Sequence, residues 1–443
     1  MKRVFLFLFI SGFVVALTLT GCGGGGQQKP VVQTTGTALT LQTGDAANDQ
    51  IVKFELTISS ITLTGASGTA NTANLLSGPA EVEFTHQAGT FEPLTLAHVP
   101  PGTYTAATMT VSDPDVVAII NGTPTKLNAT LTSTTVNVSF SPNITIGTTP
   151  MFLNFDLDLA SSVTINGTSA SISPKFNVST STVAPNENNE DNDNGEIEDV
   201  HGSVTNITAP NFTIQTDGGA ITFATDANTR FHEGINQLSD LRVGDIVEVD
   251  GVTQSDGTKL ATKVERECDH NGEEAEGIIS GLDNPLTTIS IVHQSDSTGN
   301  SNPPLSVNVA VNNNTVYSVR PDKLNITAAA FDATHIGKGQ RIEADANNNN
   351  SPLVATQVKL REQALLGTVA ASPAPTSSGF TLNVSSTSVF GTLSGVSTVT
   401  VTFANGANLK TTPTAGAAIR VRGLVFVNGT AYSMIAVRDD DNH

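Results

Sequence analysis

The stretch Asn186 to Asp199, "NENNEDNDNGEIED", collects the side chains best suited to ligating a hard cation. When its glycine is aligned with the sixth position of a calcium loop, Asn192, Asn194 and Glu196 become weak calcium candidates. The twelfth position of such a loop needs a bidentate glutamate, and here it is His201. The stretch is almost free of apolar residues, so we interpret it as a solvated linker. Weak calcium binding is the alternative, and we expect no other cofactor.

Two closely spaced pairs of reactive side chains lie elsewhere in the chain. Asp156 and Asp158 alternate on one face of an expected strand, about 7 Å apart. They could hold a cation, but a solvated outer face explains them more simply. Cys268 and His270 offer a thiol and an imidazole, whereas zinc takes three or four protein ligands. We therefore interpret Cys268 as an incidental residue of an inter-repeat linker, with a covalent dimer through it as the alternative.

Catalytic motifs are missing from the sequence. It contains no nucleophile elbow, no pair of histidines at metal-binding spacing and, after the first residues, no phosphate loop. We therefore expect a protein that is not an enzyme. Because a catalytic triad is defined by geometry and not by sequence order, a hydrolase or metal-dependent enzyme with an unrecognised site is the alternative.

The amino-terminal residues have the composition of a secretory signal. Lys2 and Arg3 precede an apolar run from Val4 to about Leu19, which is too short for a spanning helix of roughly 20 residues. The run ends in Leu19-Thr20-Gly21-Cys22, which resembles the lipobox of bacterial lipoproteins. The resemblance implies that residues 1–21 are removed and that Cys22 carries the lipid, so that the protein is anchored to a membrane without spanning it.

The residue after Cys22 is Gly23. Bacterial lipoproteins retained at the inner membrane tend to have Asp at this position, so the resemblance favours the outer membrane. Residues 22–30 then form a flexible, glycine-rich tether. Without Lys2 and Arg3 the net charge changes from −20 to −22, which opposes nucleic-acid binding because affinity for phosphate backbones comes mainly from Lys and Arg.

β-Branched residues, Gly and Asn dominate the composition and predict many short strands. In "VKFELTISSITL" the apolar alternation slips by one residue between Ile58 and Ile61, which predicts a bulge or strand bend. A turn at Pro100-Pro101-Gly102 leads into a strand with Tyr104. The run "MFLNFDLDLASSV" directs Met151, Leu153, Phe155, Leu157 and Leu159 to one face. One apolar face per strand predicts a β-sandwich over residues 31–183.

These segments, together with "TGDAANDQIVKFELTISSITL", resemble a lipoprotein domain known as domain-of-unknown-function family 4382. The resemblance implies a location and a fold. It implies no activity, because none is established for the family.

After the linker, residues 184–199, one pattern occurs three times. Each copy has an opening strand, a variable middle and a motif that begins "GDIVEVDG" at Gly244, "GQRIEADA" at Gly339 or "GAAIRVRG" at Gly416. A closing Val follows each motif Gly after 20, 19 or 21 residues. Near-constant spacing with variable middles predicts one supersecondary unit with loop insertions. The copies resemble a family of small β-barrel-like domains, domain-of-unknown-function family 5666.

The motif has one face that keeps its character and one that does not. The positions of Val247 and Val249 are apolar in every copy. The opposite face changes sign, because it carries Glu248 and Asp250 in the first copy, Glu343 and Asp345 in the second, and Arg420 and Arg422 in the third. A shared binding site would keep its charge. We therefore interpret the changing face as solvated and the motif as a fold determinant.

The sequence thus predicts an all-β chain, with an N-terminal β-sandwich followed by three small β-barrel-like repeats in series at 200–267, 268–363 and 364–440. Each repeat is large enough for its own core, so we expect independent units. The expected role is a non-catalytic binding, adhesion or assembly scaffold, anchored by lipid in the outer membrane of the bacterial cell envelope. Its expected partners are the membrane and an unidentified protein or envelope polymer.

Overall fold

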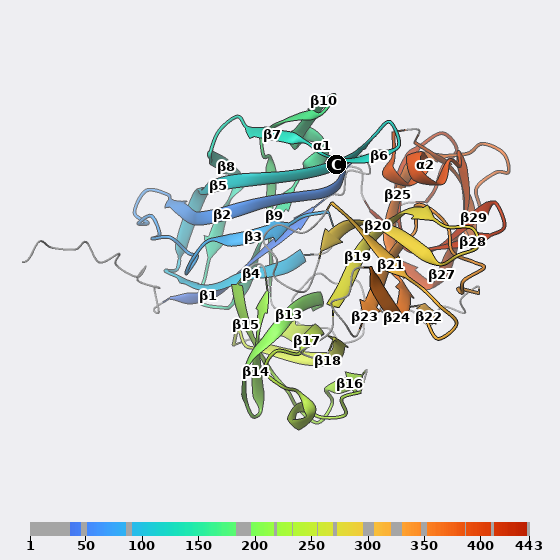
Figure 1. Cartoon of the computed structure of the whole chain (residues 1–443). Coiled ribbons are helices and arrows are strands. Elements are labelled where there is room, and N and C mark those ends of the chain that lie inside the picture. The colour runs from blue at the N-terminus through green and yellow to red at the C-terminus, as the bar shows by residue number, and fades with distance from the viewer. Residues whose placement is uncertain are drawn as a thin grey trace, which may run out of the picture. The chain divides into compact units, whose positions relative to one another are not determined.

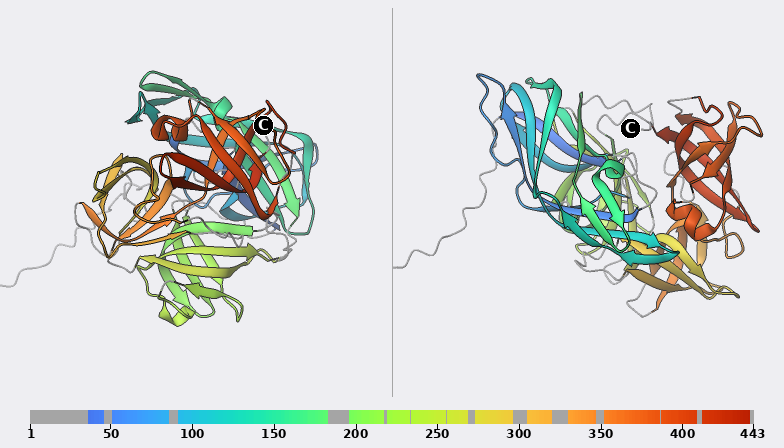
Figure 2. Two further views of the ribbon diagram at one scale, coloured as in Figure 1. Left: turned by 90° about the vertical axis from the view of Figure 1, so that its right-hand side faces the viewer. Right: turned by 90° about the horizontal axis from the view of Figure 1, so that it is seen from above.

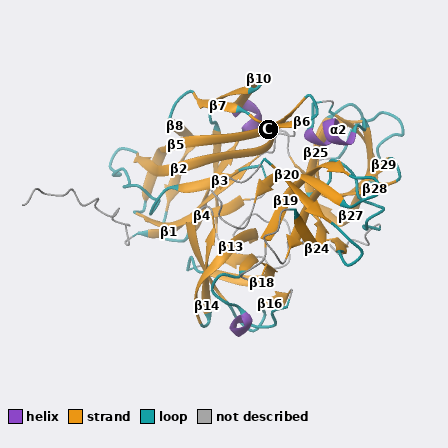
Figure 3. Cartoon of the chain, viewed as in Figure 1, coloured by secondary structure: helices purple, strands orange, loops and turns teal. Residues whose placement is uncertain are grey.

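β-Strands make up nearly all of the regular structure (Figure 3), as the composition predicts. The helical segments are α1 (Leu159–Ser162), η1 (Leu238–Asp240) and α2 (Val389–Ser394). In the part of the chain that is described, no helix has the length and apolar character needed to cross a bilayer. The computed structural model describes residues 36–45, 51–85, 91–182, 196–216, 219–232, 234–254, 256–268, 273–295, 305–319, 330–346, 352–385, 387–408 and 412–440.

The N-terminal domain is a β-sandwich (Figure 1). One sheet has the order β12-β9-β1-β4, a second has the order β3-β2-β5-β6 with β8 also on β5, and a small third sheet has the order β10-β11-β7. The strands are β1 (Thr37–Asp45), β2 (Ile51–Gly65), β3 (Ala80–Glu83), β4 (Phe91–Val99), β5 (Gly102–Ile120), β6 (Thr123–Lys126), β7 (Asn128–Leu131), β8 (Thr135–Ile146), β9 (Met151–Leu157), β10 (Val163–Asn166), β11 (Ser169–Ile172) and β12 (Phe176–Thr182).

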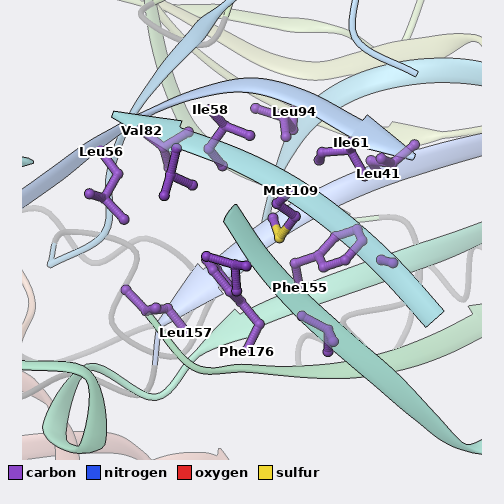
Figure 4. Packing of buried hydrophobic residues seen from close by; sticks show 14 of the residues in the cluster. Leu41, Leu56, Ile58, Ile61, Val82, Leu94, Met109, Phe155, Leu157 and Phe176 are labelled. Carbon is purple, nitrogen blue, oxygen red and sulfur yellow. The ribbon is translucent and has the colours of Figure 1, made fainter. Parts of the chain in front are cut away.

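The apolar faces of the sheets meet in one core, in which Ile58, Met109 and Phe155 are fully buried (Figure 4). The pairing of β2 with β5 shifts register between Ile58 and Ser60, which confirms the bulge predicted from the slipped alternation. Tyr104 lies just after the predicted turn, and its hydroxyl donates a hydrogen bond of 2.9 Å to the carbonyl oxygen of Pro100. Burial raises the pKa of this hydroxyl.

Strand β9 differs from its prediction on one face. Leu153, Phe155 and Leu157 belong to the sandwich core as expected. The other face is not a solvent face, because Phe152 is fully buried and Asn154 is buried beside it. Alternation identifies the two faces of a strand, but it does not reveal whether the outer face is buried.

The remaining strands form the three repeats. Repeat 1 contains β13 (Glu196–Thr208), β14 (Asn211–Thr216), β15 (Gly219–Ala224), β16 (Arg230–His232), β17 (Ile246–Thr253) and β18 (Lys259–Cys268). Repeat 2 contains β19 (Glu273–Leu282), β20 (Thr288–Ser295), β21 (Ser306–Ala310), β22 (Val316–Val319), β23 (Arg341–Ala346) and β24 (Leu353–Leu360). Repeat 3 contains β25 (Gln363–Val369), β26 (Gly379–Val384), β27 (Thr398–Asn408), β28 (Ala418–Asn428) and β29 (Ala431–Asp440).

Five strands pair in the same cyclic order in every repeat. In repeat 1 the order is β15-β14-β13-β17-β18, and β18 returns to β15 through a short parallel pairing. Repeat 2 has the equivalent order β21-β20-β19-β23-β24, with β24 returning to β21. Repeat 3 is a closed barrel, the red segment in Figure 2. The predicted series of barrel-like repeats is confirmed.

Some predicted boundaries need correction. Strand β13 begins at Glu196, so residues 196–199 are strand and not linker. Strand β18 ends at Cys268 and β25 begins at Gln363, each one residue across the predicted boundary. These positions are paired in the barrels because backbone hydrogen bonding continues beyond the apolar alternation on which the boundaries were based.

Repeats 2 and 3 are not independent units. Leu424 and Phe426 of β28 are buried in the core cluster of repeat 2. The side-chain amide of Gln340 donates a 2.7 Å hydrogen bond to the carbonyl oxygen of Val425, and the hydroxyl of Tyr432 donates one of 2.9 Å to that of Lys338. Each of the two repeats still has a core cluster of its own, as expected, but Leu424 and Phe426 join them through packing.

Candidate functional site

The calcium hypothesis receives no support from the described residues. Asn192 and Asn194 lie outside them. Glu196 and His201 both belong to β13, where their backbones pair with Val252 and Glu248. The second half of the proposed loop is thus an extended strand, a shape unlike the curved loop of a calcium site.

Asp156 and Asp158 do not form a carboxylate pair on one strand. Asp156 lies within β9, whereas β9 ends one residue before Asp158. Asp158 is the N-cap of α1, and its Oδ1 accepts a 2.9 Å hydrogen bond from the backbone N–H of Ser161. Both residues are half-buried, so the predicted solvated face is corrected here too. Asp158 thus stabilises a helix terminus.

Cys268 is the last residue of β18, where its backbone pairs with Ile246. It therefore belongs to repeat 1 and not to a linker. His270 lies outside the described residues.

The repeated motif builds the same turn three times. Gly244, Gly339 and Gly416 all have positive φ, at 97°, 87° and 81°. The backbone N–H of each glycine donates a 2.8 Å hydrogen bond to a carbonyl oxygen in the first strand of its repeat. The acceptors are Val204, Ile279 and Val369, respectively. The residue after each glycine accepts a hydrogen bond in return. The motif is a fold determinant, as interpreted.

The polar side chain after the glycine closes the turn, and either Asp or Gln can do this. Oδ2 of Asp245 accepts a 2.9 Å hydrogen bond from the N–H of Arg242, three residues earlier. Oε1 of Gln340 accepts one of 2.7 Å from the N–H of Gly337, at the same spacing. Gln340 therefore preserves the turn that Asp245 makes, although the two side chains differ in charge.

The charged face of the motif is where the sequence interpretation is wrong. Glu248 and Glu343 have no exposed surface, and Arg420 and Arg422 are 6% and 5% exposed. Charged side chains are almost never this deeply buried unless they are paired. These positions therefore form an interface and not a solvated face.

We name the site the inter-repeat charge cluster. It joins side chains of β17 and β18 in repeat 1 to side chains at β19, β23 and β24 in repeat 2. Its members are Glu248, Lys263, Glu265, Glu276, Arg341, Glu343, Lys359 and Arg361.

Arg361 is the central bridge. Its Nη1 donates to Oε2 of Glu248, 3.1 Å away in repeat 1, and to Oε2 of Glu343, 3.2 Å away in repeat 2. Its Nε lies 3.8 Å from Oε1 of Glu276. Arg361 is itself 3% exposed. One guanidinium thus joins the equivalent motif glutamates of two successive repeats.

Lys359 makes the second bridge. Its Nζ lies 2.7 Å from Oε1 of Glu343, 3.2 Å from Oδ2 of Asp345 and, across the repeats, 3.7 Å from Oε1 of Glu265. Glu265 and Lys359 occupy equivalent closing-strand positions, because they pair with Glu248 and Glu343. The change of sign between copies lets one repeat complement the next.

The carboxylates of Glu274, Glu343 and Asp345 lie within 4.8 Å of one another and are buried. Oxygen ligands at this spacing are what a divalent cation needs. Lys359, however, already places its ammonium group on two of the three. The donor set therefore suits the lysine that occupies it.

Charge pairing keeps the carboxylate of Glu276 ionised. Burial alone would raise the pKa of Glu276, but the guanidinium groups of Arg341 and Arg361 outweigh it and hold that pKa below its ordinary value. Arg341 Nη2 lies 2.7 Å from Oε1 of Glu276. Glu276 therefore serves as the counter-ion of these guanidinium groups.

The sign reversal in repeat 3 has the same explanation. Arg422 Nε donates a 3.1 Å hydrogen bond to Oε2 of Glu362, and Glu362 is 7% exposed. The reversal from Asp345 to Arg422 is therefore not evidence of solvation, because Arg422 pairs with an acid at the end of the preceding copy. Complementarity between neighbouring copies is the sequence signal that identifies it.

The comparisons with known proteins agree with the repeat architecture in one segment. Residues 201–265, within repeat 1, match the family described as "Domain of unknown function (DUF5666)". No curated protein matches the chain. Among solved structures, Drosophila Unr CSD456 is 14% identical in sequence, with a TM-score of 0.13. The match covers 55% of this chain and 98% of the Unr chain. A multidomain protein with nucleic acid binding domains from Streptococcus pneumoniae TIGR4 is 11% identical, with a TM-score of 0.13. That match covers 53% of this chain and 72% of the other chain. Similarity at this level carries no argument.

Proposed function

We propose that this protein is a non-catalytic scaffold, anchored by lipid at Cys22 in the bacterial cell envelope, that presents its β-barrel repeats in a fixed mutual arrangement. The supporting observation is the bridge that Arg361 makes between Glu248 of repeat 1 and Glu343 of repeat 2. A guanidinium that binds one carboxylate of each repeat fixes their relative register, because its planar set of donors accepts carboxylates only in a narrow geometry.

The repeats also share packing that a flexible string of domains would lack. The core of repeat 2 includes Leu424 of repeat 3, and Gln340 bonds the backbone of β28. Fixed spacing between modules suits a protein that holds a partner or an envelope polymer at a set distance from the membrane. The acidic net charge makes nucleic acid an unsuitable partner.

The alternative, a metal-dependent enzyme, would use the carboxylates of Glu274, Glu343 and Asp345. Lys359 stands against it, because its ammonium group already neutralises two of them. Calorimetric titration of the purified protein with calcium and with zinc separates the two functions. The scaffold predicts no saturable heat, whereas stoichiometric binding abolished by Glu343→Gln would support the enzyme.

The anchor has its own test. Cells grown with labelled palmitate should yield labelled wild-type protein, and a Cys22→Ser variant should be unlabelled and recovered in the soluble fraction. Wild-type protein without label would refute the anchor. Cys268→Ser is the matched control, because it removes the other cysteine and should leave both label and membrane fraction unchanged.

A further inference from the structure

Strand β8 forms an open edge of the sandwich. Among the described residues it pairs with β5 and with no other strand. An exposed strand edge presents unpaired backbone N–H and C=O groups and is a template for further pairing. Natural proteins usually protect such edges with charge, proline or short length.

Three of the other edge strands of these two sheets carry that protection. Strand β3 is short and acidic, β4 contains an acid and a proline, and β6 contains a proline and a lysine; these residues are Glu81, Glu83, Glu92, Pro93, Pro124 and Lys126. Strand β12 is uncharged but shorter than β8.

The first half of β8 has no protection. The segment Thr135–Ser141, "TVNVSFS", contains no charged residue and no proline. Val136, Val138 and Phe140 point into the core and are buried. The side chains between them are exposed.

The free hydrogen-bonding groups of β8 can be assigned. The N–H of Val111 on β5 bonds the carbonyl oxygen of Thr134, which makes 134 and 111 a hydrogen-bonded pair. In an antiparallel ladder such pairs alternate, so Val136 and Val138 direct their backbone groups toward β5. Thr135, Asn137 and Ser139 therefore direct theirs toward the open edge.

We propose that a second copy of this chain pairs with this edge, through antiparallel β8–β8 association about Asn137. Such pairing is isologous, because the same segment meets itself around a two-fold axis. It places Val136 opposite Val138 of the partner and Thr135 opposite Ser139 of the partner. The apolar faces of the two β8 strands then form one continuous apolar face.

The distribution of charge favours a second copy over a charged partner. The chain carries a net charge of −20, so most of its surface repels another copy. Segment 135–141 is uncharged and lets two copies approach without like-charge contact. A charged partner would find no complement on it. This inference concerns the sandwich alone and does not depend on the acylation of Cys22 or on the inter-repeat charge cluster.

Cysteine cross-linking tests the register. In full-length protein carrying Cys268→Ser, an Asn137→Cys change places two thiols opposite each other across the axis. Cα atoms of a hydrogen-bonded antiparallel pair are about 5.5 Å apart, within the range a disulfide spans. Mild oxidation in the membrane should convert this variant into a reducible dimer. The Cys268→Ser parent and an exposed control, Asn211→Cys, should form no reducible cross-link.

Sedimentation of the purified protein in detergent provides the second measurement. Wild-type protein should sediment as a dimer. Asn137→Lys puts two like charges opposite each other, so its dissociation constant should rise at least about tenfold. Thr123→Lys, on the β6 edge, should leave the dimer intact. Circular dichroism confirms that both variants are folded. A monomeric wild type, or Asn137→Cys that cross-links no better than Asn211→Cys, would overturn the proposal.

Discussion

Replacing Arg361 with methionine removes the cation that joins repeats 1 and 2. Methionine keeps much of the side-chain volume and takes away the charge. Glu248 and Glu343, both fully buried, then lose the guanidinium that lies 3.1 and 3.2 Å from them. Removing one partner of a buried ion pair costs about 3–5 kcal/mol, because the remaining charge is left uncompensated. We expect Arg361→Met to lose stability within this range at pH 7.

Two matched variants make the result specific. Lys126→Met removes an ion pair of similar length, 3.0 Å to Asp115, but the lysine side chain is 56% exposed. An exposed pair is worth about 0–1 kcal/mol, so this control should change little. Adding Glu248→Gln to Arg361→Met removes one stranded carboxylate. The double variant should therefore be less destabilised than the sum of its two single variants.

The assay is urea unfolding followed by circular dichroism, since the chain has no Trp to report by fluorescence. Lowering the pH provides an internal check. Burial without a counter-charge favours the protonated form of a carboxyl group, so the stranded carboxylates take up protons above their ordinary pKa, and the deficit of Arg361→Met should shrink as the pH falls toward 4. A loss below about 1 kcal/mol at pH 7, equal to that of Lys126→Met, would refute the role of Arg361.

Two further predictions concern a turn and a buried amine. Gly416→Ala should cost about 1–2 kcal/mol from its positive φ alone, because a Cβ there meets no atom within 4 Å. Gly339→Ala should cost more, since its Cβ would lie 2.9 Å from the ring of Phe390; equal losses in urea unfolding would contradict this reading. Burial lowers the pKa of Lys259 from 10.5 to about 8, so folding is penalised below pH 8 and the penalty disappears as the pH rises to about 10.5. Lys259→Met should thus be more stable than wild type at pH 7, by up to about 3 kcal/mol, and should lose this advantage near pH 10.5; an advantage that does not change with pH would contradict the cause.

Much of the architecture could be predicted because it depends on local pattern. Val247 and Val249 are fully buried, as their alternation indicates, and the slip at Ile58 marks a real bulge. The motif glycines adopt positive φ in all three copies, so a short sequence specifies the same turn wherever it occurs.

The charge cluster could not be predicted in the same way. The burial of Glu248 depends on Arg361, which is 113 positions away in the sequence. Alternation shows that Glu248 and Val249 face opposite sides, but it cannot show whether another repeat covers the polar side. Asp158 illustrates the same limit, because the end of β9 and the start of α1 turn an apparent carboxylate pair into a helix cap.

We expect the inter-repeat charge cluster to fix repeat 1 against repeat 2. Spin labels at exposed positions of the two repeats, Asn211 in β14 and Val316 in β22, measure this most directly by pulsed electron resonance, in protein carrying Cys268→Ser. The account predicts one narrow distance distribution that broadens when Arg361→Met is added. A wild-type distribution already as broad as that of the Arg361→Met protein would contradict it.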